Sequence, residues 1–174
     1  MTLLNNILPE QRRGKLKALL EAGKTVRVLE AHNGLSGIIA NMVEVTGESD
    51  GQAVVRQFDA IWESSLTDSA SKGHPDIEVV TFDSRLHSIN EILAVTDKPM
   101  IVDGDTGGEI PQFEYFVRHL ESKGVSAVII EDKVFPKRNS LDPTASQTLE
   151  DPAKFAIWQR VFERIRDDEM PPAK

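Results

Sequence analysis

The hydrophobic positions along the chain follow two alternating patterns, one typical of amphipathic helices and one typical of short buried strands. The clearest helix is predicted for residues 111–123, where apolar residues recur at i, i+3, i+4 and i+7 and Gly124 follows. The same reasoning predicts helices over residues 9–22, 35–45 and 84–95, and a last helix from Asp151 onward.

Short apolar runs between these helices predict strands. Residues 125–130 form one such run without polar alternation, as expected for a strand that is buried on both faces. The same signal predicts strands over residues 25–30, 58–62 and 99–102, while polar stretches at residues 46–50, 64–76 and 133–147 predict loops.

Strands that alternate with helices indicate an α/β fold with a parallel sheet and right-handed crossovers. Two architectures remain open on this pattern. A doubly wound sheet of about five strands would fit the length, whereas a complete (β/α)₈ barrel typically needs about 250 residues. Length alone therefore favours the doubly wound sheet.

Composition and charge narrow the classes of function. The chain has 174 residues and a formal net charge of −8, which disfavours nucleic acid and anionic membranes as partners. We expect one domain over residues 1–174, with a charged end at residues 167–174 that frays. The absence of cysteine excludes disulfides and thiolate catalysis. With no signal-peptide pattern and no long apolar run, we expect a cytoplasmic protein.

Carboxylates cluster at the ends of the predicted strands. Asp103 and Asp105 flank Gly104 directly after one strand, and Glu131 follows the next. Since the carboxyl ends of parallel strands share one edge, these side chains would repel one another without a cation, and Mg²⁺ suits oxygen ligands. The alternatives are a plain Asp-Gly turn for Asp103 and Asp105, and a solvated strand end for Glu131.

A small basic cluster stands out in this acidic chain, and it consists of Lys133, Lys137 and Arg138. The residues alone favour a solvated loop. The functional interpretation is a mobile lid whose cations close over an anion.

Residues 131–140, EDKVFPKRNS, resemble the EDK-x5-NS signature of the phosphoenolpyruvate mutase family, which belongs to the isocitrate lyase superfamily. Residues 30–36 and 61–66 look like the family's first two strand ends, and residues 103–107 look like its metal segment. The four matches come in family order. The resemblance implies a TIM-type (β/α)₈ barrel, of which this chain would hold about four to five βα units, and so reverses the preference based on length.

The resemblance also implies roles for individual residues. Asp103 would be a direct Mg²⁺ ligand, and Asp105 and Glu131 would hold the water ligands of that ion. The residues implied to line the pocket and bind the substrate carboxylate or phosphoryl group are Trp62, Ser64, Ser65 and Leu66. The residues implied to act near the transferred group are Asp76 and, on a gating loop, Lys137, Asn139 and Ser140. Whether Asp76 is a nucleophile or a positioning group stays open.

The implied activity is an isomerase of phosphonate biosynthesis that interconverts phosphoenolpyruvate and phosphonopyruvate, both small molecules, in a homo-oligomer. A phosphonopyruvate hydrolase of the same family would share the metal residues, but Asn139 and Ser140 favour the mutase. The lyases that resemble this family use a cysteine on the gating loop, which this chain lacks.

Residues beyond about 150 set a limit on the resemblance. One helix is predicted there and no further strand, and the family's later substrate-binding arginine and histidine have no match. The alternatives are a truncated chain, a half-barrel completed by another chain, and a non-catalytic interaction domain.

Overall fold

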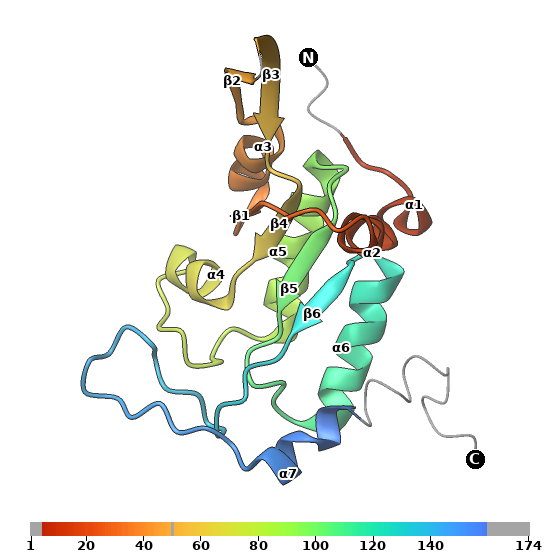
Figure 1. The fold of residues 1–174 in the computed structure, drawn as a ribbon. Helices are drawn as coiled ribbons and strands as arrows, with labels where there is room; N and C mark the ends of the chain where they lie inside the picture. Colours follow the sequence, from red (N-terminus) through yellow and green to blue (C-terminus); the bar gives the residue numbers. More distant parts are fainter. Residues whose placement is uncertain (1–4, 50, 160–174) are drawn as a thin grey trace.

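A four-stranded parallel sheet forms the centre of the molecule, which a computed structural model describes over residues 5–49 and 51–159 (Figure 1). The strands are β1 (Val28–Glu30), β4 (Ala60–Glu63), β5 (Met100–Asp103) and β6 (Ala127–Ile129), and they lie side by side in chain order. All three strand pairs are parallel. This order, without the reversal that a doubly wound sheet requires, is the winding of a (β/α) barrel.

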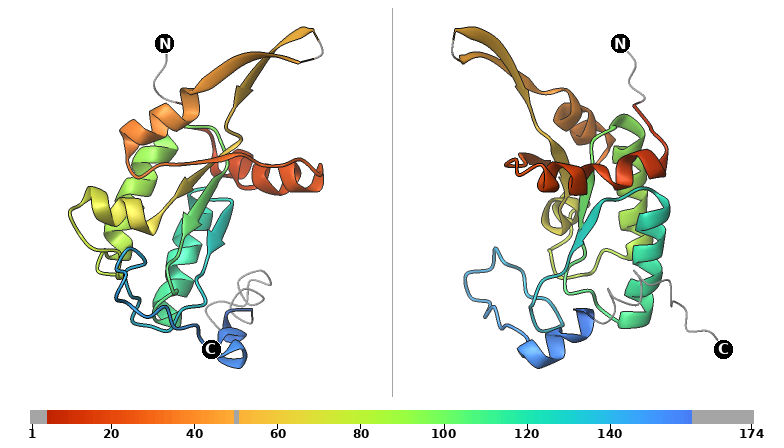
Figure 2. Two further views of the ribbon diagram at one scale, coloured as in Figure 1. Left: turned by 60° about the vertical axis from the view of Figure 1, so that its left-hand side comes forward. Right: turned by 45° about the vertical axis from the view of Figure 1, so that its right-hand side comes forward.

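Helices α3 (Gly34–Met42), α5 (Phe82–Val95) and α6 (Ile110–Ser122) pack on the same face of the sheet (Figure 2). Ile61 and Met100 of the strands are fully buried in one core with Ile89 of α5. The aromatic stripe of α6 joins this core, since the rings of Phe116 and Phe82 stack with centroids 4.3 Å apart. The predicted alternation of strands and helices is thus confirmed.

Residues 9–22 form two helices instead of the single one predicted, α1 (Pro9–Arg13) and α2 (Lys15–Glu21). Gly14 separates them and has a weak preference for helix, because glycine loses more backbone entropy there than other residues. The last predicted helix begins as expected with α7 (Pro152–Phe155), where the Asp151 carboxylate accepts a hydrogen bond from the Ala153 amide. The remainder of that predicted helix beyond residue 159, and residues 167–174, lie outside the described residues.

The loop predicted at residues 46–50 is wrong over residues 46–49, because strands β2 (Glu44–Ser49) and β3 (Gln52–Gln57) form an antiparallel hairpin that projects from the body (Figure 2). Gly51, with φ +74°, supplies a left-handed residue at the turn. Nearly every hairpin side chain is exposed, so the hydrophobic alternation that would have predicted these strands is missing.

The loop predicted at residues 64–76 is also wrong over its first half, which forms helix α4 (Ser65–Ser71). This helix buries polar side chains in place of apolar ones, including Asp68. The Asp68 carboxylate accepts a hydrogen bond of 2.8 Å from the Ser88 hydroxyl of α5 and forms an ion pair with Lys72. Because the side chains that α4 buries are polar and hydrogen-bonded, this helix has no apolar periodicity in the sequence.

Both edges of the sheet are open within the described residues, since β1 pairs only with β4 there. At the other edge, β6 pairs only with β5. Beside this edge lies an apolar hollow whose lining includes Phe113, Leu120, Val128 and Trp158.

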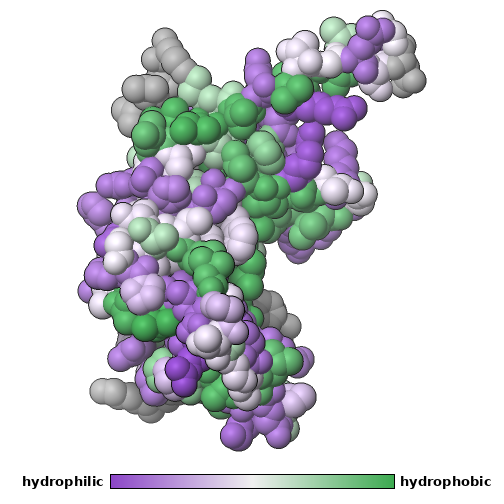
Figure 3. Space-filling view, turned by 90° about the vertical axis from the view of Figure 1, so that its left-hand side faces the viewer, coloured by the Kyte–Doolittle hydropathy of each residue, from purple (hydrophilic) through white to green (hydrophobic). Residues whose placement is uncertain are grey.

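No helix in the described ranges is long and apolar enough to cross a membrane. On the face drawn in Figure 3, hydrophobic residues gather over the upper half, where the hairpin joins the body.

Candidate active site at the carboxyl ends of the strands

The segment after β5 is a tight turn that holds two buried carboxylates. Asp103 accepts hydrogen bonds from the Ser65 hydroxyl at 3.0 Å, the Ser65 amide at 3.3 Å and the Asp105 amide at 3.0 Å. Gly104 lies so close to β6 that a Cβ there would meet the Ile129 carbonyl oxygen at 2.8 Å. Asp105 follows with φ +54°, a left-handed conformation that aspartate tolerates better than most residues. The same tight turn therefore positions both carboxylates of the site, Asp103 and Asp105.

A buried lysine from the loop after β6 joins these carboxylates. The Lys137 Nζ lies 2.7 Å from Asp105 Oδ1, 2.9 Å from Asp76 Oδ2 and 3.4 Å from Glu131 Oε1, and it donates to the Ser65 hydroxyl at 3.1 Å. Burial opposes the charge on Lys137, but Asp105 and Asp76 outweigh burial and raise its pKa. The basic cluster is therefore only partly a solvated loop, because one of its three members is a buried cation.

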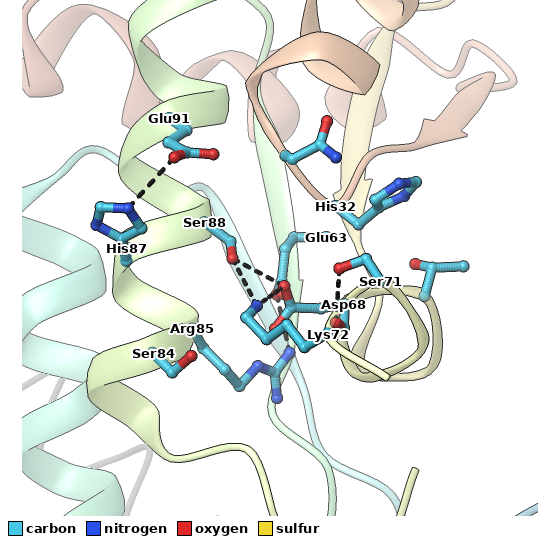
Figure 4. Close-up of polar contacts among 12 residues, drawn as sticks. His32, Glu63, Asp68, Ser71, Lys72, Ser84, Arg85, His87, Ser88 and Glu91 are labelled. Carbon is cyan, nitrogen blue, oxygen red and sulfur yellow. Dashed lines mark hydrogen bonds and ion pairs between the residues drawn. The ribbon is translucent and has the colours of Figure 1, made fainter. Parts of the chain in front are cut away.

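Two residues to which the sequence assigned no role complete the network. Arg85 reaches from α5, and its guanidinium donates to Glu63 Oε2 at 2.8 Å (Figure 4). It also donates to Asp105 Oδ2 at 2.7 Å. All three groups are buried. Burial raises the pKa of Glu63 to about 7, against the opposing effect of Arg85. An arginine on an amphipathic helix is normally a surface residue, so only the contact in space identifies Arg85.

Glu78 adds a further carboxylate at the rim. Its Oε1 accepts from both the amide and the hydroxyl of Thr106 at 2.7 Å. Burial raises its pKa, while the two hydrogen bonds from Thr106 oppose that shift. Its φ of +60° places a non-glycine residue in the left-handed region, so the surrounding contacts hold this backbone.

The structure brings together six of the residues assigned a role by the resemblance. They are Ser65, Asp76, Asp103, Asp105, Glu131 and Lys137. The segments that carry them converge from β4, β5, β6 and the loops that follow (Figure 1).

Asn139 and Ser140 lie farther out on the loop. The Asn139 side-chain oxygen accepts from the Leu141 amide, and the Ser140 hydroxyl accepts from Lys133. These are contacts within the loop, and neither residue has a hydrogen bond to the carboxylates among the contacts of the described residues.

The other implied substrate contacts lie at the end of β4 and the start of α4. Trp62 is half-buried, and its indole N–H is buried without a hydrogen-bond partner in the described part of the chain. Ser64 is the buried N-cap residue of α4, and Leu66 is half-buried in the first turn. Their roles toward a substrate stay predictions.

Within the described ranges, no group of three or more histidine, aspartate or glutamate side chains is already arranged to hold a metal ion. Instead, Asp76, Asp105 and Glu131 share the ammonium group of Lys137. Their donors are carboxylate oxygens, which are the ligands that Mg²⁺ prefers, and they already surround a cation. The chemistry of the donor set therefore fits a hard divalent ion.

Comparison with known proteins supports the same family. The phosphoenolpyruvate phosphomutase of Tetrahymena pyriformis is 35% identical over 136 residues, which are 78% of this chain and 41% of that protein. The phosphonopyruvate hydrolase of Variovorax sp. is 33% identical over 135 residues, which are 77% of this chain and 42% of that protein. A probable 2-methylisocitrate lyase of Corynebacterium glutamicum is 32% identical over 133 residues. The chain thus spans about two fifths of the first two relatives.

Solved structures agree with the fold. The crystal structure of phosphoenolpyruvate phosphomutase from Streptomyces platensis matches 95% of this chain with a TM-score of 0.70 and 32% identity, over 51% of that chain. Phosphonopyruvate hydrolase in complex with oxalate and Mg²⁺ matches 76% of this chain with a TM-score of 0.59 and 32% identity, over 41% of that chain. The family model described as phosphoenolpyruvate phosphomutase matches residues 16–170. The chain belongs to the phosphoenolpyruvate phosphomutase family, within a superfamily that also holds hydrolases and lyases.

Proposed function

We propose that the protein to which this chain belongs interconverts phosphoenolpyruvate and 3-phosphonopyruvate, with this chain supplying the metal-binding and phosphoryl-binding half of the site. The observation that carries the proposal is the convergence of Lys137 with Asp76 and Asp105, because it joins a loop cation to one carboxylate after β5 and one between α4 and α5. This arrangement suits an anionic substrate bound through a divalent ion.

In this proposal, Asp103 would hold Mg²⁺ directly, and Asp105 and Glu131 would hold its water ligands. When bound, Mg²⁺ would supply Lewis-acid stabilisation of the negative charge on the pyruvate enolate. Arg85 would hold the Asp105 carboxylate in place through its 2.7 Å hydrogen bond.

The chain's own residues would then bind and orient the phosphoryl group. The bond between phosphorus and the enol oxygen breaks, and a bond between phosphorus and carbon 3 forms, with no net oxidation. Lys137 and Asn139 would stabilise the charge of the transferred group. The substrate would also be bound by Ser65 and by its neighbours Trp62, Ser64 and Leu66. Ser140 would contact it from the loop. Asp76 lies 2.9 Å from Lys137, so it would orient that ammonium group toward the phosphoryl group.

Exclusion of water separates this reaction from hydrolysis. If water reached the phosphoryl group, the product would be pyruvate and inorganic phosphate. The second candidate function is therefore that of a phosphonopyruvate hydrolase, and the 33% identity of this chain to such an enzyme supports it.

Phosphorus NMR of the protein with phosphonopyruvate and Mg²⁺ tests the proposal. A phosphoenolpyruvate signal would support the mutase, and inorganic phosphate would support the hydrolase. No conversion by this chain or by a longer chain of the same protein would favour a non-catalytic domain. Asp103→Asn should abolish either conversion, whereas Arg138→Gln, next to Lys137 but exposed, should retain most of it.

A further inference from the structure

Two lysines attach the loop after β6 to the site. Lys133 Nζ lies 3.0 Å from Glu131 Oε2 at the base of the loop, and Lys137 reaches further in, to Asp76 and Asp105. The base of the loop is fixed where the Val134 amide donates to the Thr148 carbonyl at 3.0 Å and the Glu150 amide donates to the Asp132 carbonyl at 2.8 Å. Between these points Lys137 is only 3% exposed, although both its neighbours in sequence are exposed. The ammonium group therefore anchors an otherwise exposed loop over the carboxylates.

The same oxygens that would serve a metal ion already bind this ammonium group. Lys137 Nζ contacts Asp105 Oδ1 at 2.7 Å and Glu131 Oε1 at 3.4 Å. An oxygen committed to an ammonium group is a poorer acceptor for the water ligands of a metal ion, and a divalent ion beside the ammonium group would repel it strongly at this burial. Lys137 and the ion would therefore depend on the same two carboxylates.

We propose that Lys137 and the divalent cation compete for Asp105 and Glu131, so that entry of the metal releases the loop. The released lysine is then free to bind a second anion, the phosphoryl group of the substrate. The competition would impose an order, in which the metal binds first and the loop closes again only over bound substrate. This inference rests on the magnesium site of the proposed function.

Titration calorimetry with MgCl₂ tests the competition on the folded chain without substrate. Lys137→Gln should bind Mg²⁺ about tenfold more tightly than the unmodified chain, which is within the usual range of coupling between two ligands. Arg138→Gln is the matched control, because it removes the same charge from the next residue, which is exposed. Its affinity for Mg²⁺ should change by less than about twofold, as expected for a screened surface charge.

Amine labelling provides a readout that needs no substitution, in case Lys137→Gln does not fold. Acetylation of the unmodified chain, followed by peptide mass spectrometry, should leave Lys137 protected without Mg²⁺ and modified with it. Lys17, which is 79% exposed, should be modified equally in both states.

The outcomes separate this inference from the proposal on which it rests. Equal Mg²⁺ affinity in all three chains, with Lys137 protected in both states, would overturn the competition and leave the magnesium site intact. Absence of Mg²⁺ binding from every chain would overturn the magnesium site and the competition together. Phosphorus NMR decides the reaction separately.

Discussion

Glu63 is a fully buried carboxylate, and in the described part of the chain its ion-pair partner is Arg85, which it shares with Asp105. Two carboxylates on one guanidinium leave the group of three with a net negative charge. Asp68 and Asp103 lie close enough to raise the pKa of Glu63 further. The charge of the site therefore depends on the protonation state of Glu63.

Glu63 should make stability depend on pH. Its pKa is raised to about 7 in the folded chain from 4.5, so the folded state binds more protons than the unfolded state between these values. Stability should therefore fall as pH rises from about 4.5 to 7, by up to about 3 kcal/mol. Urea denaturation across this range should show a shallower slope in Glu63→Gln, with the remainder due to groups such as Glu78, whose pKa burial also raises. The same slope in Glu63→Gln as in the unmodified chain would contradict the assignment, and Glu21→Gln, at an exposed position, is the control.

Replacement of Arg85 should be among the most destabilising single changes. Arg85→Met would leave Glu63 and Asp105 buried without this cation, at a loss of about 3–5 kcal/mol. Asp105 keeps its ion pair with Lys137, so the double variant Arg85→Met/Glu63→Gln removes the carboxylate that loses its partner and should recover part of that loss. Equal stability of the single and double variants in urea would show that the pair Arg85–Glu63 does not act as a unit.

At the scale of elements, the spacing between β5 and β6 depends on the absence of a side chain at residue 104. A Cβ there would lie 2.8 Å from the Ile129 carbonyl oxygen and 3.0 Å from the Phe113 ring. The Gly104 amide also donates to that carbonyl at 2.7 Å. This close approach fixes the turn on which Asp103 and Asp105 sit.

Gly104→Ala should therefore separate the two strands and weaken the fold by about 1–3 kcal/mol, as overpacking usually does. The midpoint of thermal or urea unfolding measures the loss. Gly47→Ala is the matched control, because nothing lies within 4 Å of a Cβ at that hairpin position. If both variants unfolded alike, the close contact of β5 with β6 would not matter for stability.

At the scale of the whole molecule, the edge of β6 that is unpaired in the described part of the chain lies beside an apolar hollow, so unpaired backbone groups and apolar side chains occur together there. Such edges pair readily with other chains unless charge or cover prevents it. Ile129, at 44% exposure, lies on this edge strand. Self-association through this edge is one route to the homo-oligomer that the resemblance implies.

Ile129→Lys should reduce concentration-dependent association, because a charge on an edge strand opposes pairing. Light scattering over a range of protein concentrations measures the effect. Tyr115→Lys introduces the same charge at an exposed position of α6 and should leave association unchanged. Association that persists in Ile129→Lys would place the contact elsewhere.

The sequence alone determined the repeating order of strands and helices, because short apolar runs and helical periodicity arise from burial within each segment. It also carried the four motifs that indicated the family, and with them Asp103, Asp105, Glu131 and Lys137. It did not predict β2, β3 or α4, because their exposed or hydrogen-bonded polar side chains leave no apolar pattern.

Tertiary structure decided which charges meet. That Lys137 occupies the position among Asp76, Asp105 and Glu131, and that Arg85 joins Asp105 to Glu63, depends on segments up to 61 residues apart in the chain. A local pattern records only whether a side chain is apolar or polar. The partner of a buried charge is set by how the strands and loops converge in space, since a buried charge requires a counter-charge wherever the chain can bring one.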